Sequence, residues 1–294
     1  RDQGPQSPRS GPRAPAPCGA DFHPKALLMP IVRILYKNHG AGDVKWDAKS
    51  QVAALPACHV GDENRGKVWR STGAGTCEWL RVKMCSTSLA VDRVAFITYN
   101  FTSCAYIGIE AHCTSCFDDG AAPPGFTTCF APWTASRTGV SFFDISAQQK
   151  RLWWRFVMCD TGVDDGYYQV GVVALGPATC MRVGPERLRY WIEDPSILDY
   201  APAGTPKATL RDPYVMVELS HRFIAETLVF SGLQDVIRDG GRRKDMVLSL
   251  YTSEPSCTCA AVETNLYGRL EETLQFSYVL PGEYDAVVRF RESR

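Results

Sequence analysis

The sequence predicts an all-β protein, a disulfide-stapled β-sandwich with one or two peripheral helices. Short runs of alternating apolar and polar residues recur along the chain, segments rich in Gly, Pro and Asp separate them, and 12 of the 294 residues are cysteine. A period of two is typical of half-buried strands, and many short strands at this spacing are typical of a sandwich or barrel. The cysteine content indicates an oxidising, extracellular environment.

The clearest strand is the run CEWLRVKMC, whose cysteines raise a geometric problem. Its apolar residues alternate with basic ones and share one face; they are Leu80, Val82 and Met84. In an extended strand Cys77 and Cys85 would lie roughly 26 Å apart, at about 3.3 Å per residue. A disulfide needs a Cα separation of about 4.4–6.8 Å. We therefore expect each of these cysteines to bond to another segment.

All the cysteines are expected to form such staples between strands and loops, each contributing about 2–4 kcal/mol. The run HCTSC has Cys-x2-Cys spacing, which zinc sites also use, but no second such pair follows, so disulfides are favoured. We expect neither a metal nor another cofactor. The predicted disulfide cysteines are Cys18, Cys58, Cys77, Cys85, Cys104, Cys113, Cys116, Cys129, Cys159, Cys180, Cys257 and Cys259.

Two regions are predicted from composition. Residues 1–17 are rich in Pro, Arg, Ser and Gly, which predicts a disordered tail, and residues 18–294 then form one β-sandwich domain. Segment 221–241 has apolar residues at helical spacing and favours a helix over one sheet, ending at Gly240, although strand–turn–strand is the alternative. The predicted strands lie within 28–38, 77–85, 93–101, 104–113, 151–160, 166–175, 214–219, 245–254, 273–280 and 284–292.

The connections between strands also carry predictions. Segment 161–166 (TGVDDG) predicts a hairpin joining its two flanking strands, and Pro281-Gly282 predicts a type II turn. Segment 201–213 is rich in Pro, Ala and Gly and predicts a loop within the single domain.

Composition narrows the class of protein. The formal net charge is zero and no apolar run is long enough to span a membrane, so we expect neither nucleic-acid binding nor a membrane span. The chain starts at Arg1 without a charged-then-apolar leader, so we expect a secreted protein in its mature form or one whose signal has been removed. Asn100 heads an Asn-x-Thr sequon and is expected to carry a glycan. We find no catalytic motif and expect no enzymatic activity.

The candidate ligand-binding residues are acidic and aromatic side chains in loops, where they could capture a basic protein. We expect a monomer or homodimer that binds a host chemokine or cytokine. The basic run 238–244 could contact a sulfated glycosaminoglycan, although short charged runs are usually solvated loops. The predicted ligand-binding residues are Asp118, Asp119, Asp160, Asp164, Asp165, Tyr167, Tyr168, Glu193 and Asp194.

The segment TCEWLRVKMCSTS resembles part of the poxvirus secreted chemokine-binding proteins, which have a similar Cys-Glu-x6-Cys strand, matched here by Cys77, Glu78 and Cys85. The resemblance implies a two-sheet sandwich that sequesters host chemokines. A parapoxvirus inhibitor of granulocyte–macrophage colony-stimulating factor and interleukin-2 is the alternative. Its WSxWS-like motif is reduced here to the Trp-Asp of WDAKS (46–50). An ectodomain of a cell-surface or envelope protein remains a third alternative.

Overall fold

The computed structural model describes residues 32–42, 44–74, 77–86, 89–102, 105–112, 127–131, 139–160, 162–181, 186–200, 206–250 and 265–293. Most of this chain forms antiparallel β-sheets, so the predicted fold class is confirmed. The predicted tail at 1–17 lies outside the described residues. None of the described helices is long and apolar enough to cross a membrane.

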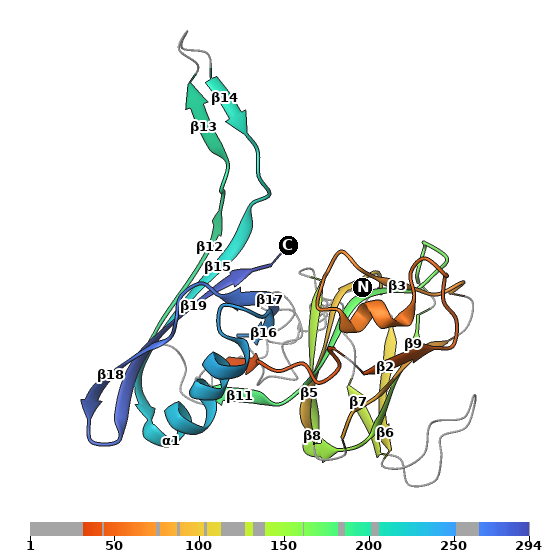
Figure 1. Ribbon diagram of the computed structural model, residues 1–294, viewed down its shortest axis with the longest axis horizontal. Helices are drawn as coiled ribbons and strands as arrows, with labels where there is room; N and C mark the ends of the chain where they lie inside the picture. The colour runs from red at the N-terminus through yellow and green to blue at the C-terminus, as the bar shows by residue number, and fades with distance from the viewer. Residues whose placement is uncertain are drawn as a thin grey trace, which may run out of the picture.

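Two sheets pack face to face as a sandwich (Figure 1). The first sheet has the order β2 (Lys45–Ala48), β4 (Glu78–Lys83), β9 (Trp153–Cys159), β6 (Tyr106–His112), β7 (Thr127–Ala131). The second has the order β3 (Trp69–Arg70), β10 (Gln169–Gly176), β5 (Ala90–Tyr99), β8 (Val140–Lys150). A short 3-10 helix, η1 (Ala57–Gly61), packs against β10 and β2.

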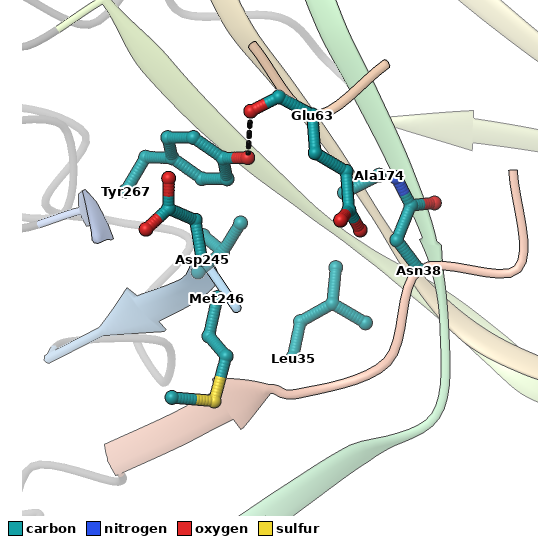
Figure 2. Close-up of a pocket in the computed structure, with 8 residues that line it drawn as sticks. Leu35, Asn38, Glu63, Ala174, Asp245, Met246 and Tyr267 are labelled. Atoms are coloured by element: carbon teal, nitrogen blue, oxygen red, sulfur yellow. Dashed lines mark hydrogen bonds between the residues drawn. The ribbon is translucent and has the colours of Figure 1, made fainter. Parts of the chain in front are cut away.

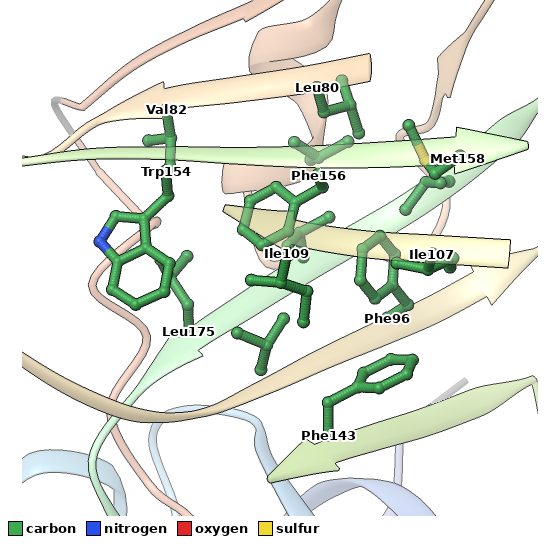
Figure 3. Close-up of a cluster of buried hydrophobic side chains, with 14 of the residues drawn as sticks. Leu80, Val82, Phe96, Ile107, Ile109, Phe143, Trp154, Phe156, Met158 and Leu175 are labelled. Atoms are coloured by element: carbon green, nitrogen blue, oxygen red, sulfur yellow. The ribbon is translucent and has the colours of Figure 1, made fainter. Parts of the chain in front are cut away.

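The sandwich core is aromatic and closely packed (Figure 3). Phe96 of the four-stranded sheet meets Phe156 of the five-stranded sheet edge to face, with ring centroids 5.7 Å apart, an arrangement that aromatic rings prefer. The apolar face predicted for the CEWLRVKMC strand belongs to this core, because Leu80, Val82 and Met84 are all buried. The alternation read from the sequence is therefore confirmed.

A third, larger sheet stacks on the four-stranded sheet. Its order is β11 (Ala178–Met181), β1 (Val32–Leu35), β16 (Met246–Ser249), β17 (Asn265–Leu270), β19 (Glu283–Glu292), β15 (Tyr214–Ala225), β12 (Arg187–Glu193), and β18 (Gln275–Leu280) pairs with β19. Ile97 and Val172 of the middle sheet contact a cluster that includes Leu35 and Val247 of this third sheet. Burial on both faces explains why β10 reads as a continuous apolar run, VGVVAL.

A small cavity marks the junction between the middle and third sheets (Figure 2). Its volume of about 10 Å³ is that of a single water-sized probe. Across it the hydroxyl of Tyr267 donates a hydrogen bond of 2.9 Å to the carbonyl oxygen of Glu63. Burial raises the pKa of Tyr267, so the hydroxyl stays a donor. Burial also raises the pKa of the Glu63 carboxyl, despite nearby Lys244. The cavity joins layers and is too small for a ligand.

The helix predicted within 221–241 is present from Glu226 onward, whereas residues 221–225 are the end of strand β15. One helical segment, α1 (Glu226–Leu228) continuing through η2 (Val229–Leu233) and η3 (Val236–Gly240), covers the outer face of the third sheet (Figure 1). Val229, Leu233 and Val236 are buried in the core cluster of that sheet. The segment ends at Gly240, as predicted, because Gly241 adopts a φ of +55°, a conformation that glycine tolerates.

Several connections differ from expectation. β9 and β10 lie in different sheets, so the predicted hairpin across 161–166 is wrong. The predicted loop 201–213 contains β14 (Pro206–Thr209), which pairs with β13 (Ile197–Tyr200). Together they extend β12 and β15 into a hairpin arm that rises from the body (Figure 1). The turn at Pro281-Gly282 is confirmed, since it joins β18 to β19 and Gly282 has a φ of +82°.

Of the two cysteines that flank β4, one forms a disulfide with a neighbouring strand. Cys77 bonds to Cys159 at the end of the adjacent strand β9, with Cα atoms 4.3 Å apart. Cys58, Cys85 and Cys180 form no disulfide within the described chain. The remaining predicted disulfide cysteines have side chains outside the described residues; they are Cys18, Cys104, Cys113, Cys116, Cys129, Cys257 and Cys259. Among the described side chains no three His, Cys, Asp or Glu residues gather as a metal-binding set.

Candidate binding face

The outer face of the five-stranded sheet combines tryptophan with arginine and lysine. Alternate residues of β4 point away from the core, and Trp79, Arg81 and Lys83 therefore share this face. On β9 the same face carries Trp153 and Arg155. The register places Arg81 opposite Arg155 and Lys83 opposite Trp153. Aromatic and cationic side chains are therefore neighbours on this face.

The central cation of this face lies between two indoles. The guanidinium carbon of Arg81 is 4.8 Å from the ring centroid of Trp79 and 5.9 Å from that of Trp153. The ammonium of Lys83 lies 5.4 Å from the same Trp153 ring. Distances within about 6 Å are typical of attractive cation–π contacts. We call these four residues, Trp79, Arg81, Lys83 and Trp153, the cation–aromatic ladder.

Two ion pairs brace the ladder across the sheet. Arg81 pairs with Asp47 of β2, and Arg155 pairs with Glu110 of β6. Both carboxylates face cations on neighbouring strands, so they fix the orientation of the guanidinium groups. Lys45 and Lys83, which face each other across β2 and β4, are exposed. This face therefore has a formal charge of +2, from Lys45, Arg81, Lys83 and Arg155 against Asp47 and Glu110.

Tyr106 extends the aromatic surface onto β6. It is 46% exposed, and its ring lies about 3.5 Å from where a Cβ of Gly108 would project. The tyrosine ring therefore lies beside Gly108, where a Cβ would make only ordinary van der Waals contact with it. Partial burial and the nearby Glu110 carboxylate raise the pKa of Tyr106, so its hydroxyl remains protonated.

Two of the predicted ligand-binding residues do not reach the surface. Asp160 is 5% exposed, and its carboxylate accepts hydrogen bonds from the backbone N–H and the hydroxyl of Thr102 and from the N–H of Gly162. Tyr168 is 1% exposed, and its hydroxyl donates to the carbonyl oxygen of Asp160. The structure corrects the surface placement expected for both residues: they hold the loop that follows β9.

The remaining predicted acids are split between two places. Asp164 and Asp165 are exposed in the loop between β9 and β10, where the Tyr167 ring lies 4.0 Å from the guanidinium of Arg70. Glu193 and Asp194 lie where β12 enters the arm, on the other half of the molecule (Figure 1). The acidic residues therefore do not gather into one rim. Asp118 and Asp119 lie outside the described residues.

Asn100, the predicted glycan acceptor, is engaged in local hydrogen bonds. Its Nδ2 donates to the carboxylate of Asp165 at 3.1 Å and to the carbonyl oxygen of Tyr167 at 2.8 Å. Its Oδ1 accepts from the backbone N–H of Gln169 at 2.8 Å. A glycan on Nδ2 would replace one of the two donated hydrogens. Attachment at this site therefore requires the loss of one of these bonds.

Sequence reasoning missed the ladder, although a signal for it was present. Both β4 and β9 contain Trp-x-Arg, at Trp79-x-Arg81 and Trp153-x-Arg155. The equal spacing shows that each strand presents tryptophan and arginine on one face. It does not show that the two strands are neighbours with these residues in register, which only the sheet order supplies.

Comparison with protein-family models and with curated protein sequences finds no match. Among solved structures, the chain is similar to chitosan-binding module 1 of a chitosanase/glucanase from Paenibacillus sp. IK-5, with 19% identity, a TM-score of 0.39, and coverage of 48% of this chain and 99% of that one. It is also similar to a family 32 carbohydrate-binding module of Clostridium perfringens in complex with GalNAc-β-1,3-galactose, with 10% identity, a TM-score of 0.37, and coverage of 48% and 100%. The likeness concerns β-sandwich architecture in about half of the chain, and we draw no functional argument from it.

Proposed function

We propose that the protein is a secreted, non-catalytic binding protein whose ligand site is the outer face of the five-stranded sheet. The cation–aromatic ladder carries this proposal, because Arg81 lies within 6 Å of two tryptophan rings on the outer sheet face. Arg81 and both tryptophans are half-buried there, and Lys83 is exposed. The ligand class that fits is an anionic polysaccharide, such as a sulfated glycosaminoglycan.

The chemistry of the face favours this class of ligand. Indole rings offer flat apolar surfaces against which sugar rings can lie, and guanidinium groups bind sulfate and carboxylate in a forked geometry. The flanking ammonium groups of Lys45 and Lys83 add long-range attraction that salt screens. A net charge of +2 opposes the capture of a small basic protein on this face. Binding should therefore weaken as ionic strength rises.

The second candidate is sequestration of a host chemokine or cytokine. In the described part of the sandwich its support is the β9–β10 loop, where Asp164 and Asp165 are exposed beside Tyr167. Two adjacent carboxylates on a loop can steer a basic protein, but the buried Asp160 and Tyr168 no longer contribute. The poxvirus resemblance, the activity against granulocyte–macrophage colony-stimulating factor and interleukin-2, and the ectodomain alternative remain proposals that the same binding assay can compare.

The test uses the full chain in surface plasmon resonance over immobilised heparin, fully desulfated heparin, chemokines and both cytokines. Reversal of two exposed cations, Lys45→Glu with Lys83→Glu, should weaken heparin binding at least tenfold. The matched variant Arg242→Glu with Arg243→Glu makes the same charge change in the basic loop 238–244 and should change binding less than twofold.

Each alternative has its own signature in this assay. Loss of heparin binding only in the Arg242/Arg243 variant would move the glycan site to the basic loop and overturn our assignment. Chemokine binding that is lost in Asp164→Asn with Asp165→Asn, without any heparin binding, would favour the second candidate. Equal affinity for desulfated and native heparin would show that sulfate groups are not recognised and would refute a sulfated polysaccharide as the ligand.

A further inference from the structure

The strand β12 ends the third sheet with an open edge. In the described chain it pairs with β15 on one side and with no strand on the other. Figure 1 draws it at the base of the hairpin arm, away from the sandwich. Alternate residues of such a strand present backbone N–H and C=O groups that lack a ladder partner, and these groups can pair with another strand.

Large apolar side chains of β12 are also exposed to solvent. Leu188, Tyr190 and Ile192 share one face, opposite residues of β15 that belong to the core of the third sheet, such as Val217 beside Tyr190. Leu188 packs on this core. Tyr190 is nevertheless 49% exposed and Ile192 is 66% exposed. The core of the third sheet therefore does not cover all of β12, and Tyr190 and Ile192 extend its apolar surface into the solvent.

The sequence of β12, RLRYWIE, is complementary to itself when two copies run antiparallel about Tyr190. Arg187 then faces Glu193 of the other copy, Leu188 faces Ile192, and Arg189 faces Trp191. These are two opposite-charge pairs, two apolar pairs and two cation–aromatic pairs, with tyrosine facing tyrosine on the two-fold axis. Direct cross-strand pairs of these kinds stabilise antiparallel sheets, and a two-fold interface must be self-complementary in this way.

We propose that β12 is a homodimer interface, in which two copies of this chain join edge to edge in the register centred on Tyr190. The two third sheets then form one continuous sheet. Charges on an edge strand usually oppose pairing with other strands. Here they do not oppose a second copy, because Arg187 and Glu193 have opposite signs and exchange places across the axis. This inference is independent of the proposed glycan site.

Neighbouring registers and other edges fit less well. Centring on Trp191 sets Leu188 against Asp194, and centring on Arg189 sets Ile192 against Glu186. Both shifts place an apolar side chain opposite a carboxylate. The strand β18 is also apolar and exposed, with Tyr278 and Leu280 largely uncovered, but it contains no charged residue and so offers no charge complementarity.

The oligomeric state of the full chain tests the interface. Sedimentation velocity at micromolar concentrations should show a dimer. Arg187→Glu alone and Glu193→Arg alone each place like charges opposite one another twice, and should raise the dimer dissociation constant at least tenfold. The double variant exchanges the two charges and should restore dimerisation to within a few-fold of the wild type. A monomer for the unaltered chain, or a double variant weaker than both single variants, would overturn the proposal.

The register has a separate covalent test. Tyr190→Cys places thiols of the two copies directly opposite each other, so mild oxidation should give a covalent dimer. Ile192→Cys places the two introduced thiols on opposite sides of the axis and should give little. Combining Leu188→Cys with Ile192→Cys should restore cross-linking. Equal cross-linking of Tyr190→Cys and Ile192→Cys, measured against the background of the native cysteines, would refute this register.

Discussion

Loss of the Cys77–Cys159 disulfide should destabilise the fold strongly. The two cysteines close a loop with a sequence separation of 82 residues, which contains β4 to β9 and so most of the five-stranded sheet. The bond joins adjacent antiparallel strands in the register set by the pair Glu78 and Met158. It therefore constrains the unfolded chain while matching the geometry of the folded sheet.

The expected magnitude follows from loop closure. Closing a loop of 82 residues removes chain entropy worth about 4.5 kcal/mol at 25 °C in the unfolded state. For a chain of 294 residues, whose unfolding entropy is about 0.6 kcal/mol/K, a loss of that order should lower the melting temperature by about 7 °C. Alanine at both positions avoids leaving a lone thiol that air oxidation could join to Cys58 or Cys85, which form no disulfide within the described chain.

Urea unfolding of Cys77→Ala, Cys159→Ala and the double variant measures the effect, followed by tryptophan fluorescence and far-ultraviolet circular dichroism. Because either substitution breaks the same bond, both single variants and the double variant should lose nearly the same free energy of unfolding. Losses that simply add in the double variant, or that stay below about 1 kcal/mol, would show that the cross-link does not stabilise the protein as the chain-entropy argument requires.

Two further substitutions test the sheets. Glu78 is 5% exposed, and burial raises its pKa although hydrogen bonds to Ser50 oppose the shift. A charged Glu78 therefore lowers the stability of the fold above the raised pKa, and this loss of stability disappears as the pH falls toward 4.5. Glu78→Gln should accordingly raise the melting temperature at pH 7 and change it little at pH 4; a pH-independent difference would contradict this. Gly268→Ala places a Cβ 2.0 Å from the carbonyl oxygen of Arg291 and should cost about 3 kcal/mol in urea unfolding, whereas Gly73→Ala, with open space around it, should cost little.

The sequence predicted several of the strands in which one face alone is buried, but it missed β8 (Val140–Lys150). Among the predicted strands β4 is the best example, since Leu80 and Val82 alternate with residues that the solvent reaches. The sequence did not predict which strands pair within one sheet, because this pairing joins segments that are far apart in the sequence. The segment 161–166 resembles a hairpin turn locally, but the chain uses it to cross from β9 in one sheet to β10 in another. Local turn chemistry does not distinguish these two outcomes.

The candidate site was harder to predict than the fold for a related reason. The sequence predicts a binding surface made of acidic and aromatic loop residues because loops often carry function. Asp160 and Tyr168 show the weakness of that argument, since a loop side chain can be buried to hold the loop itself. The ladder depends on strand register, which aligns Arg81 between Trp79 and Trp153. A single sequence gives each strand's face but not its neighbour.

The two proposals together make one prediction that neither makes alone. A dimer joined through β12 carries two cation–aromatic ladders, so a long anionic polymer can engage both and gain avidity, provided that its chain can span them. A monomeric variant, Glu193→Arg, should then bind long heparin chains at least tenfold more weakly, yet bind a short heparin oligosaccharide as the wild type does, because each ladder is intact. Lys45→Glu with Lys83→Glu should weaken binding of both ligands. If Glu193→Arg weakened the oligosaccharide equally, β12 itself would contribute to the glycan site.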